Sequence, residues 1–446
     1  MIVVRKYRLY PDQNQRAAIM QTFGCVRVVY NSCIDDYKTK YQTWIQNGKQ
    51  QGQLNTNPVL VSTLKQTKPW LKNADALALS VARMNFIKAL SDFFKERKTK
   101  KGKKHRAGFP QYKKRGKAKY SYTTCNQGDN IRFDQDNTHI KLPKLGWVEV
   151  VKHRPMPDEG KIGRVTVSMN AAEEFYVSLN IECTDRLPVV SKVYNLDRLR
   201  FVGLDMSLSD FCISSDNTDD MITKYIRNYR KEEQHLKNLD RRLSLKEKYR
   251  KETIDGKEVK VETKNHRKAR IKRAKAYLKV ARRRKEFCIK MARYFAMKYD
   301  VVCIEDLDMQ SMSKTLHLGK SVMDLGWGMF TEWLSYECLK YDTVIIKADK
   351  WYPSSKTCNH CRYVNKGLGL SDREWVCPEC GEVISRDRNA ACNLRDYAVK
   401  KINSVGTSEC NDRGTLATLR ETFSGVMSVH EGVYKTKGKE AAKSLV

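Results

Sequence analysis

Residues 357–391 of this 446-residue chain read TCNHCRYVNKGLGLSDREWVCPECGEVISRDRNAA, and they decide how the C-terminal half is built. The stretch holds two Cys-x-x-Cys pairs with fifteen residues between them, Cys358/Cys361 and Cys377/Cys380. Two such knuckles supply four thiolates in a tetrahedron around one Zn²⁺, so this spacing predicts a zinc ribbon. Because four thiolates close the coordination sphere, we expect a structural zinc and not a catalytic one.

One further residue of the first knuckle, His360, is a poorer zinc ligand, because its offset from the cysteines points it away from the knuckle. The other cysteines of the chain, such as Cys25, Cys183 and Cys303, lie singly inside apolar patterns. We interpret them as reduced core residues and expect no disulfide framework.

Three carboxylates outside the cysteine pairs suggest a second kind of metal site. Asp387 opens a helical run just after the last knuckle, and Asp205 and Glu305 each end a short apolar run far upstream. Hydrolysis of a phosphodiester by two Mg²⁺ about 3.5–4 Å apart needs carboxylate oxygens as ligands. The pattern alone leaves alternatives open: Asp387 as a helix N-cap, Asp205 as a turn residue, and Asp306 or Asp308 in place of Glu305.

The composition favours a nucleic-acid partner. The chain has 85 Lys and Arg against 51 Asp and Glu, a formal net charge of +34. Nucleic acid accounts for an excess of this size better than solubility does, and an anionic membrane surface is the alternative. No apolar run approaches the roughly 18–20 residues of a membrane span, and no signal peptide is expected at the N-terminus. We therefore expect a cytosolic or nuclear protein.

Two segments concentrate the positive charge. Residues 97–119 carry twelve Lys or Arg and no acid, together with glycines and aromatics, which is typical of a loop that tracks a strand. Residues 266–287 carry eleven, with an apolar stripe that would leave a cationic helix face along phosphates. In both segments the alternative is a solvated face. The candidate nucleic-acid contacts are Lys98, Lys100, Lys101, Lys103, Lys104, Arg106, Tyr112, Lys113, Lys114 and Arg115, then Lys268, Lys272, Lys275, Arg282, Arg283 and Arg284.

Apolar periodicity divides the chain into two halves. A strand at 1–10, helical segments within about 12–125 and β patterns over 129–184 predict a small β-barrel domain over 1–190 with a helical insertion. In the second half, strands alternate with helices, which is typical of an α/β domain. The fold class expected is therefore multidomain α+β.

Several motifs in order resemble the TnpB family, the transposon-encoded RNA-guided DNA endonucleases that are the ancestor of compact type V CRISPR effectors. The resemblance spans about residues 1–402. It rests on Phe201-Val202-Gly203-Leu204-Asp205 as the first RuvC motif, Ile304-Glu305-Asp306-Leu307 as the second, Tyr352-Pro353-Ser354-Ser355-Lys356-Thr357-Cys358 before the zinc ribbon, and Arg386-Asp387-Arg388-Asn389-Ala390-Ala391 as the third.

The resemblance implies an RNase H-like (RuvC) fold in which Asp205, Glu305 and Asp387 bind two catalytic Mg²⁺, and it selects Glu305 over its acidic neighbours. It also implies a nuclease domain over 191–350 and 382–403, with the zinc ribbon over 351–381, and a helical insertion that helps the barrel grip the RNA–DNA hybrid. The apolar pattern fades from Gly406, so we expect a loosely ordered tail over 404–446. Three positions depart from the family pattern: Ser385, where a second Asp is frequent, Arg388, where an aliphatic is common, and Arg362, where Gly is usual.

These features together predict an Mg²⁺-dependent, RNA-guided DNA endonuclease with one structural Zn²⁺. Its partners would be a guide RNA and target double-stranded DNA, with no membrane, and a monomer in the prokaryotic cytoplasm near the nucleoid is favoured. The alternatives are a compact type V CRISPR effector with an array-derived guide, a guide-free nuclease of the same fold, and a binding-only repressor. The sequence does not give the guide, the motif flanking the target or the cut positions.

Overall fold

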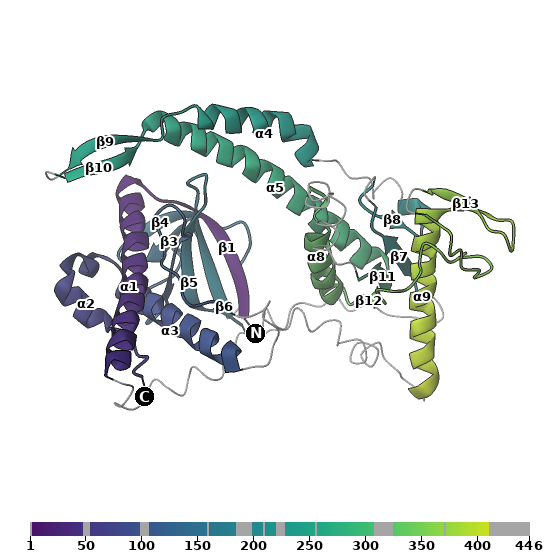
Figure 1. The fold of residues 1–446 in the computed structure, drawn as a ribbon, viewed down its shortest axis with the longest axis horizontal. Helices are drawn as coiled ribbons and strands as arrows, with labels where there is room; N and C mark the ends of the chain where they lie inside the picture. The colour runs from purple at the N-terminus through teal and green to yellow at the C-terminus, as the bar shows by residue number, and fades with distance from the viewer. Residues whose placement is uncertain are drawn as a thin grey trace. The chain divides into compact units, whose positions relative to one another are not determined.

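The computed structural model divides into two compact units, Met1–Asp185 and Arg186–Val446, which are described separately. Figure 1 shows the elements of both. The structure describes residues 2–47, 54–98, 107–157, 160–183, 199–207, 210–219, 228–254, 257–306, 324–369 and 372–409. Among these residues no helix is both long and apolar enough to span a bilayer.

A six-stranded antiparallel sheet forms the frame of the N-terminal unit. Its order is β2-β5-β6-β1-β4-β3, so the first strand of the chain lies between strands from much later in the sequence. The strands are β1 (Ile2–Tyr10), β2 (Tyr120–Cys125), β3 (His139–Leu142), β4 (Gly146–Val151), β5 (Lys161–Met169) and β6 (Phe175–Glu182). Strand β2 lies before the region 129–184 in which the sequence predicts β-structure. Its residues are largely polar and show no clear strand pattern, and they are extended because they pair with β5.

Helices fill the connection between β1 and β2. They are α1 (Gln13–Gln46), α2 (Val61–Thr67), the 3₁₀ helix η1 (Pro69–Asn73) and α3 (Ala76–Lys98). Helix α1 begins with a capping box, in which the Asp12 carboxylate accepts from the Gln15 N–H at 2.8 Å. These helices have a core of their own, with Phe86 and Leu79 fully buried, so the insertion is a packed subdomain.

A four-stranded sheet of order β12-β11-β7-β8 organises the C-terminal unit. Strands β7 (Phe201–Asp205), β11 (Val301–Glu305) and β12 (Val344–Ala348) are parallel, and the short β8 (Ile213–Ser214) pairs antiparallel with β7. The remaining elements are η4 (Asn217–Asp219), α4 (Asn228–Ser244), β9 (Tyr249–Ile254), β10 (Lys257–Glu262), α5 (Lys264–Lys298), α8 (Trp327–Lys340), β13 (Glu374–Val376), β14 (Val383–Ser385) and α9 (Arg386–Glu409).

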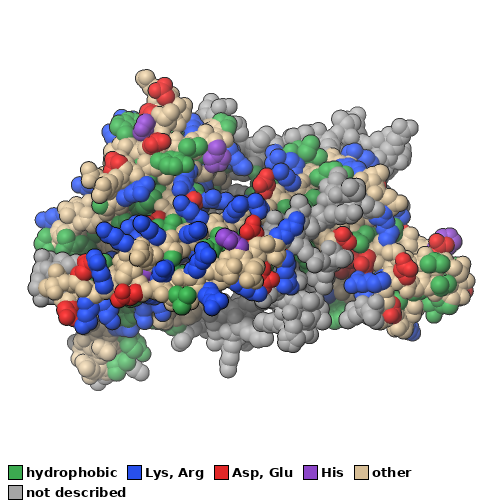
Figure 2. Space-filling model, turned by 90° about the horizontal axis from the view of Figure 1, so that it is seen from above, with side chains coloured by type: hydrophobic (Ala, Val, Ile, Leu, Met, Phe, Trp, Pro, Cys, Tyr) green, Lys and Arg blue, Asp and Glu red, His purple; other side chains and the backbone are tan. Residues whose placement is uncertain are grey.

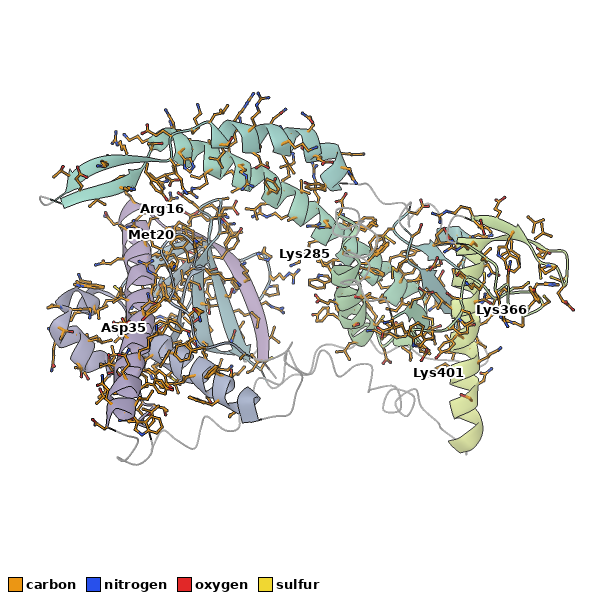
Figure 3. The ribbon with its side chains drawn as sticks, viewed as in Figure 1. Arg16, Met20, Asp35, Lys285, Lys366 and Lys401 are labelled. Carbon is orange, nitrogen blue, oxygen red and sulfur yellow. The ribbon has the colours of Figure 1, made fainter. Side chains whose placement is uncertain are left out.

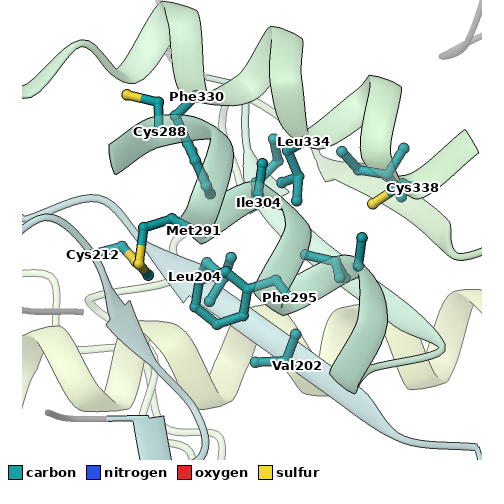
Figure 4. Close-up of a cluster of buried hydrophobic side chains, with 14 of the residues drawn as sticks. Val202, Leu204, Cys212, Cys288, Met291, Phe295, Ile304, Phe330, Leu334 and Cys338 are labelled. Atoms are coloured by element: carbon teal, nitrogen blue, oxygen red, sulfur yellow. The ribbon is translucent and has the colours of Figure 1, made fainter. Parts of the chain in front are cut away.

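Both faces of the parallel strands are buried, which explains why they read as continuous apolar runs. Val202 and Ile304 face a core formed with α5 and α8, shown in Figure 4. Val301 and Cys303 face a second core formed with Leu394 and other residues of α9. The sheet therefore lies between α5 and α8 on one face and α9 on the other. The two units together confirm a mixed α/β, multidomain fold.

The chain enters α9 directly from the β13–β14 hairpin, because β14 ends at Ser385 and the helix begins at the next residue. Helix α9 continues to Glu409, past residue 404, where the sequence pattern predicts that loose order begins. Residues 410–446 of that expected tail lie outside the described residues.

Candidate functional site

Asp205 and Glu305 lie at the same edge of the sheet. Each is the last residue of its strand, and Val301 to Ile304 pair in parallel with Phe201 to Leu204. Asp205 and Glu305 come directly after the paired residues Leu204 and Ile304, so they lie side by side at the ends of neighbouring strands. Successive side chains of a strand alternate between faces. Asp205 and Glu305 therefore share the face of the residues that pack against α9.

Asp387 reaches the same region from the first turn of α9. The helix lies close against β7 because Gly203 has no side chain: a Cβ there would stand 2.0 Å from the Ala391 carbonyl oxygen and 2.5 Å from the Arg395 backbone nitrogen. The glycine in the first motif therefore permits the close approach between the strand that carries Asp205 and the helix that carries Asp387.

The charges of the three carboxylates interact. Burial, and then repulsion from Glu305 and Asp387, raises the pKa of Asp205 well above its usual range, although Arg386 and a backbone N–H act in the other direction. A positive charge beside Asp205 would therefore favour its ionised form.

Neighbouring side chains hold the other two carboxylates. The Ser354 hydroxyl donates a short hydrogen bond to Glu305, and Ser354 is itself buried. Arg373 forms an ion pair with Asp387 at 3.2 Å. The competing candidate Asp306 has an exposed side chain paired with Lys347 at 3.6 Å, and Asp308 lies outside the described residues.

The four cysteines form a tight cluster of metal ligands. The sulfurs of Cys358 and Cys380 are 3.8 Å apart, and those of Cys361 and Cys377 are 3.5 Å apart. A tetrahedral Zn²⁺ with bonds of about 2.3 Å separates its sulfur ligands by roughly 3.8 Å, so the donor set fits zinc. Within the part of the chain that is described, this is the one group of three or more His, Cys, Asp or Glu whose ligand atoms all lie within 4.8 Å of one another.

Two contrasts follow from that cluster. His360 is exposed and is not a member of the group. The oxygens of Asp205, Glu305 and Asp387 are not gathered as tightly as the thiols. Mutual repulsion, together with the separate partners Ser354 and Arg373, gives a physical reason for the wider spacing.

Each cysteine knuckle closes through a residue in the left-handed region. Gly381 has φ 72° and its N–H donates to the Cys377 carbonyl at 2.8 Å, while Arg362 has φ 70° and its N–H donates to the Cys358 carbonyl at 3.0 Å. This geometry favours glycine, which explains why Gly is usual where this chain has Arg362. The Arg362 side chain makes a contact that glycine could not, an ion pair with Asp396.

Polar side chains join the first knuckle to α9, and of these the sequence had marked Arg362 only as a departure from the family pattern. Arg362 pairs with Asp396 at 2.6 Å, and Asn359 donates to the same carboxylate at 2.7 Å. Asn389 and Asn393, both buried on α9, donate to the Thr357 carbonyl at 2.7 and 2.6 Å. The ribbon and the helix of Asp387 are therefore joined on the side of the sheet that carries the carboxylates. Of these side chains, the sequence could have indicated Asn389, because it lies within the third motif.

The basic candidates on α5 are mostly exposed. Figure 2 looks down on the face carrying α4 and α5 and shows Lys and Arg side chains gathered along it. The exposed candidates are Lys268, Lys272, Lys275, Arg282 and Arg283. Of these, Arg283 pairs with Glu232 on α4 at 3.3 Å. Arg284 is half-buried, with its side chain beside Gly326.

The basic loop before β2 is described only in part. Candidates Lys100, Lys101, Lys103, Lys104 and Arg106, and the side chain of Lys98, lie outside the described residues. Tyr112 donates to Asp35 at 2.6 Å, and Figure 3 labels Asp35 on α1. The Lys113 ammonium lies 3.9 Å from the centre of the Tyr30 ring. Lys114 and Arg115 are exposed, so this end of the loop lies against α1 with its charges outward.

Three family models match the chain. Residues 192–316 match the OrfB_IS605 model, described as a probable transposase; residues 327–394 match the Cas12f1-like TNB domain; and residues 1–49 match the HTH_OrfB_IS605 model, described as a helix-turn-helix domain. In this structure residues 2–46 of the last match form β1 and the single long helix α1. The TNB match contains all four cysteines and Asp387.

Curated relatives match along most of the chain. A Streptomyces pristinaespiralis protein is 28% identical over 392 residues, which is 87% of each chain, and Escherichia coli InsQ is 25% identical over 87% of this chain and 90% of its own. Both are named as candidate RNA-guided DNA endonucleases. Among solved structures, a Cas12f1–sgRNA–target DNA complex matches with 14% identity and a TM-score of 0.45, covering 86% of this chain and 83% of that one.

The order of the motifs, the three model matches and the length of the curated alignments agree with one another. Mimivirus proteins named TnpB-like are 30% identical over 132 residues, which covers 28% of this chain and 25% of theirs. The chain is therefore similar to proteins named RNA-guided DNA endonucleases along most of its length, and to TnpB-like proteins over part of it.

Proposed function

We propose that this chain is an RNA-guided DNA endonuclease that cuts DNA by Mg²⁺-dependent hydrolysis at a single RuvC-like site formed by Asp205, Glu305 and Asp387. The observation that carries the proposal is the register of β7 and β11, with two carboxylates ending adjacent parallel strands on the face covered by the helix of the third. The names of the curated relatives support the same activity.

The donor set fits Mg²⁺ in chemistry. Hard divalent cations take carboxylate oxygens. The pKa of Asp205 is raised by burial and then by the charges of Glu305 and Asp387, and a bound cation would offset both effects. Mg²⁺, when bound, supplies an activated water and stabilises the leaving oxygen. The protein's own part is to hold the carboxylates: Ser354 binds Glu305, Arg373 pairs with Asp387, and Gly203 lets α9 approach β7.

We assign one structural Zn²⁺ to Cys358, Cys361, Cys377 and Cys380. Its role would be to stabilise the knuckles that are hydrogen-bonded to α9, because metal binding and local folding are coupled. The zinc site therefore supports Asp387 indirectly, through the contacts of Asn359 and Arg362 with Asp396.

The guide RNA and the target duplex would be bound largely through backbone charge. In this mode of recognition, pairing between guide and target reads the sequence, and the protein reads shape and a short flanking motif. We assign the N-terminal barrel-like sheet with its helical insertion, and the exposed cations of α5, to this task. A Cas12f1 complex with guide RNA and target DNA is among the similar solved structures. The protein would act in the cytoplasm of a prokaryote.

A compact type V CRISPR effector is the second candidate, favoured by the match of residues 327–394 to the Cas12f1-like TNB domain. The two candidates share their chemistry and differ in the source of the guide. The neighbouring DNA separates them, since a repeat array indicates the CRISPR effector and a transposon end indicates a TnpB nuclease.

The test combines RNA identification with cleavage. RNA that co-purifies with the protein is sequenced, and a duplex containing its matching sequence is offered with Mg²⁺ or with EDTA. We expect cleavage only with Mg²⁺, and its loss in Asp205→Ala, Glu305→Ala and Asp387→Ala with guide-dependent DNA binding retained. Asp306→Ala is the matched control and should cut. Near-normal cleavage by Glu305→Ala would refute the assignment, and cleavage by RNA-stripped protein would favour a guide-free nuclease.

A further inference from the structure

The loop after β12 has both of its ends next to Glu305. Ala348, the last residue of β12, is the register partner of Glu305. Six residues later, Ser354 donates its hydroxyl to the Glu305 carboxylate. The residues between them are therefore held next to the carboxylate edge of the sheet at both ends.

Trp351 lies at the middle of this loop, and its side chain points into solvent. It is 83% exposed, the highest value among the exposed large apolar side chains of the described residues. The next residue, Tyr352, points the other way: its hydroxyl donates to the Asn393 carbonyl at 3.3 Å, and its ring centre is 4.9 Å from that of Tyr397. The loop thus buries one aromatic ring against α9 and presents the other outward.

The backbone of Trp351 is fixed by a turn. Its N–H donates to the Asp349 carboxylate at 2.8 Å, and the Tyr352 N–H donates to the Asp349 carbonyl at 3.0 Å. A single exposed apolar residue is ordinary on a protein surface. Here, however, the turn is hydrogen-bonded on both sides of Trp351, and it holds this large apolar side chain in solvent.

The surroundings of the ring indicate what would cover it. The Lys350 ammonium is 5.5 Å from the centre of the Trp351 ring, which puts a cation beside an aromatic face. A nucleotide carries the complementary groups, a flat base and a phosphate. Stacking of a base on an aromatic ring requires that the base is unpaired, as in a single strand.

We propose that Trp351 is a stacking platform for an unpaired nucleobase of the DNA strand that enters the carboxylate edge, with Lys350 beside the adjacent phosphate. The inference rests on the proposed function, since it takes that edge as the place where a strand is cut. It adds a residue that positions the substrate and binds no metal. Stacking is tolerant of sequence, so the platform would serve any target.

The experiment uses the full chain with its co-purified RNA and three variants. Trp351→Phe keeps an aromatic face, Trp351→Leu keeps apolar bulk without one, and Trp147→Leu removes a 43% exposed tryptophan of the N-terminal unit. The probes are a single-stranded oligodeoxynucleotide and a set of copies in which one base at a time is replaced by an abasic residue. Binding is measured with Ca²⁺ in place of Mg²⁺, at a salt concentration that suppresses binding through phosphates alone.

We expect Trp351→Leu to weaken binding about 5- to 150-fold, the equivalent of ~1–3 kcal/mol, and Trp351→Phe to bind almost as the native chain does. One abasic position should weaken binding to the native chain and cause little further weakening in Trp351→Leu, because both changes remove the same stack. Trp147→Leu should bind normally. Zinc content equal to that of the native chain shows that the loop and ribbon of each variant are folded.

The platform proposal is refuted if the native chain and Trp351→Leu bind equally well. It is also refuted if the effect of Trp351→Leu simply adds to the effect of every abasic position. Cleavage in Mg²⁺ is measured in parallel and separates this result from the proposed function. A native chain that cuts while Trp351→Leu binds normally refutes the platform alone. A native chain that never cuts refutes the nuclease assignment, whatever the binding data show.

Discussion

Gly203 in β7 lies directly beneath Ala391 in α9, so closely that a Cβ on Gly203 would stand 2.0 Å from the Ala391 carbonyl oxygen. Strand β7 ends at Asp205, and α9 carries Asp387 in its first turn. The distance between Asp205 and Asp387, two of the proposed metal ligands, therefore depends on Gly203, where there is no room for a side chain.

Gly203→Ala should displace α9 and impair cleavage more than it impairs folding. Overpacking at such a position costs about 1–3 kcal/mol of unfolding free energy, and a shift of the helix N-terminus would lower the cleavage rate about 100-fold. Thermal unfolding and single-turnover cleavage measure the two effects. Gly328→Ala is the matched control, because Gly328 in α8 has no atom within 4 Å of the added Cβ. A Gly203→Ala protein with native cleavage would show that the position of α9 does not depend on this close approach.

Removal of zinc should loosen the segment around Asp387. Cys358→Ser and Cys377→Ser remove ligands, so each variant should contain well under one zinc per chain and should expose the ribbon and the start of α9 to proteolysis. Cys125→Ser, at a half-buried cysteine of the N-terminal unit, is the control and should keep its zinc. Metal analysis that finds well under one zinc per native chain would contradict the assignment.

Arg362 should show two opposing effects that substitution can separate. Its φ of 70° disfavours any residue with a Cβ, while its guanidinium binds Asp396 at 2.6 Å and Asn393 at 3.0 Å. Both Arg362→Gly and Arg362→Ala remove the guanidinium, but only the glycine relieves the backbone strain. The alanine variant should therefore be less stable than the glycine variant by about 1 kcal/mol. Equal thermal stability of the two would mean that this turn is not strained.

Neutralising the exposed cations of α5 should weaken nucleic-acid binding and its dependence on salt. Replacing Lys268, Lys272 and Lys275 by Gln should lower the log–log slope of affinity against salt by about 0.7–0.9 for each phosphate that is no longer neutralised. The preferred target sequence should stay the same, because interactions with the phosphate backbone carry no base information. Lys251→Gln is the control, since Lys251 pairs with Glu258 at 3.0 Å on the β9–β10 hairpin. Unchanged slopes would make this helix face a solvated surface.

The sequence by itself determined the local parts of this protein. Cysteine knuckles need only a few consecutive residues, so their spacing predicted a cluster whose sulfurs the structure brings to 3.5 and 3.8 Å. The parallel strands were recognisable because their residues are apolar on both faces, and each of the first two ends at an acidic residue. The long helices were recognisable from their periodicity, although α1 continues to Gln46, beyond its clearest apolar pattern.

Only the tertiary structure decided which of these parts meet. That Asp205 and Glu305 share a face follows from their register, but that α9 covers this face depends on the packing of residues nearly 200 positions apart, such as Gly203 with Ala391. The same holds for Ser354 at Glu305 and for strand β2, whose extended form comes from pairing with β5. Periodicity and spacing report what a residue's near neighbours require. Contacts between distant segments depend on how their surfaces fit, and no local pattern of residues records that fit.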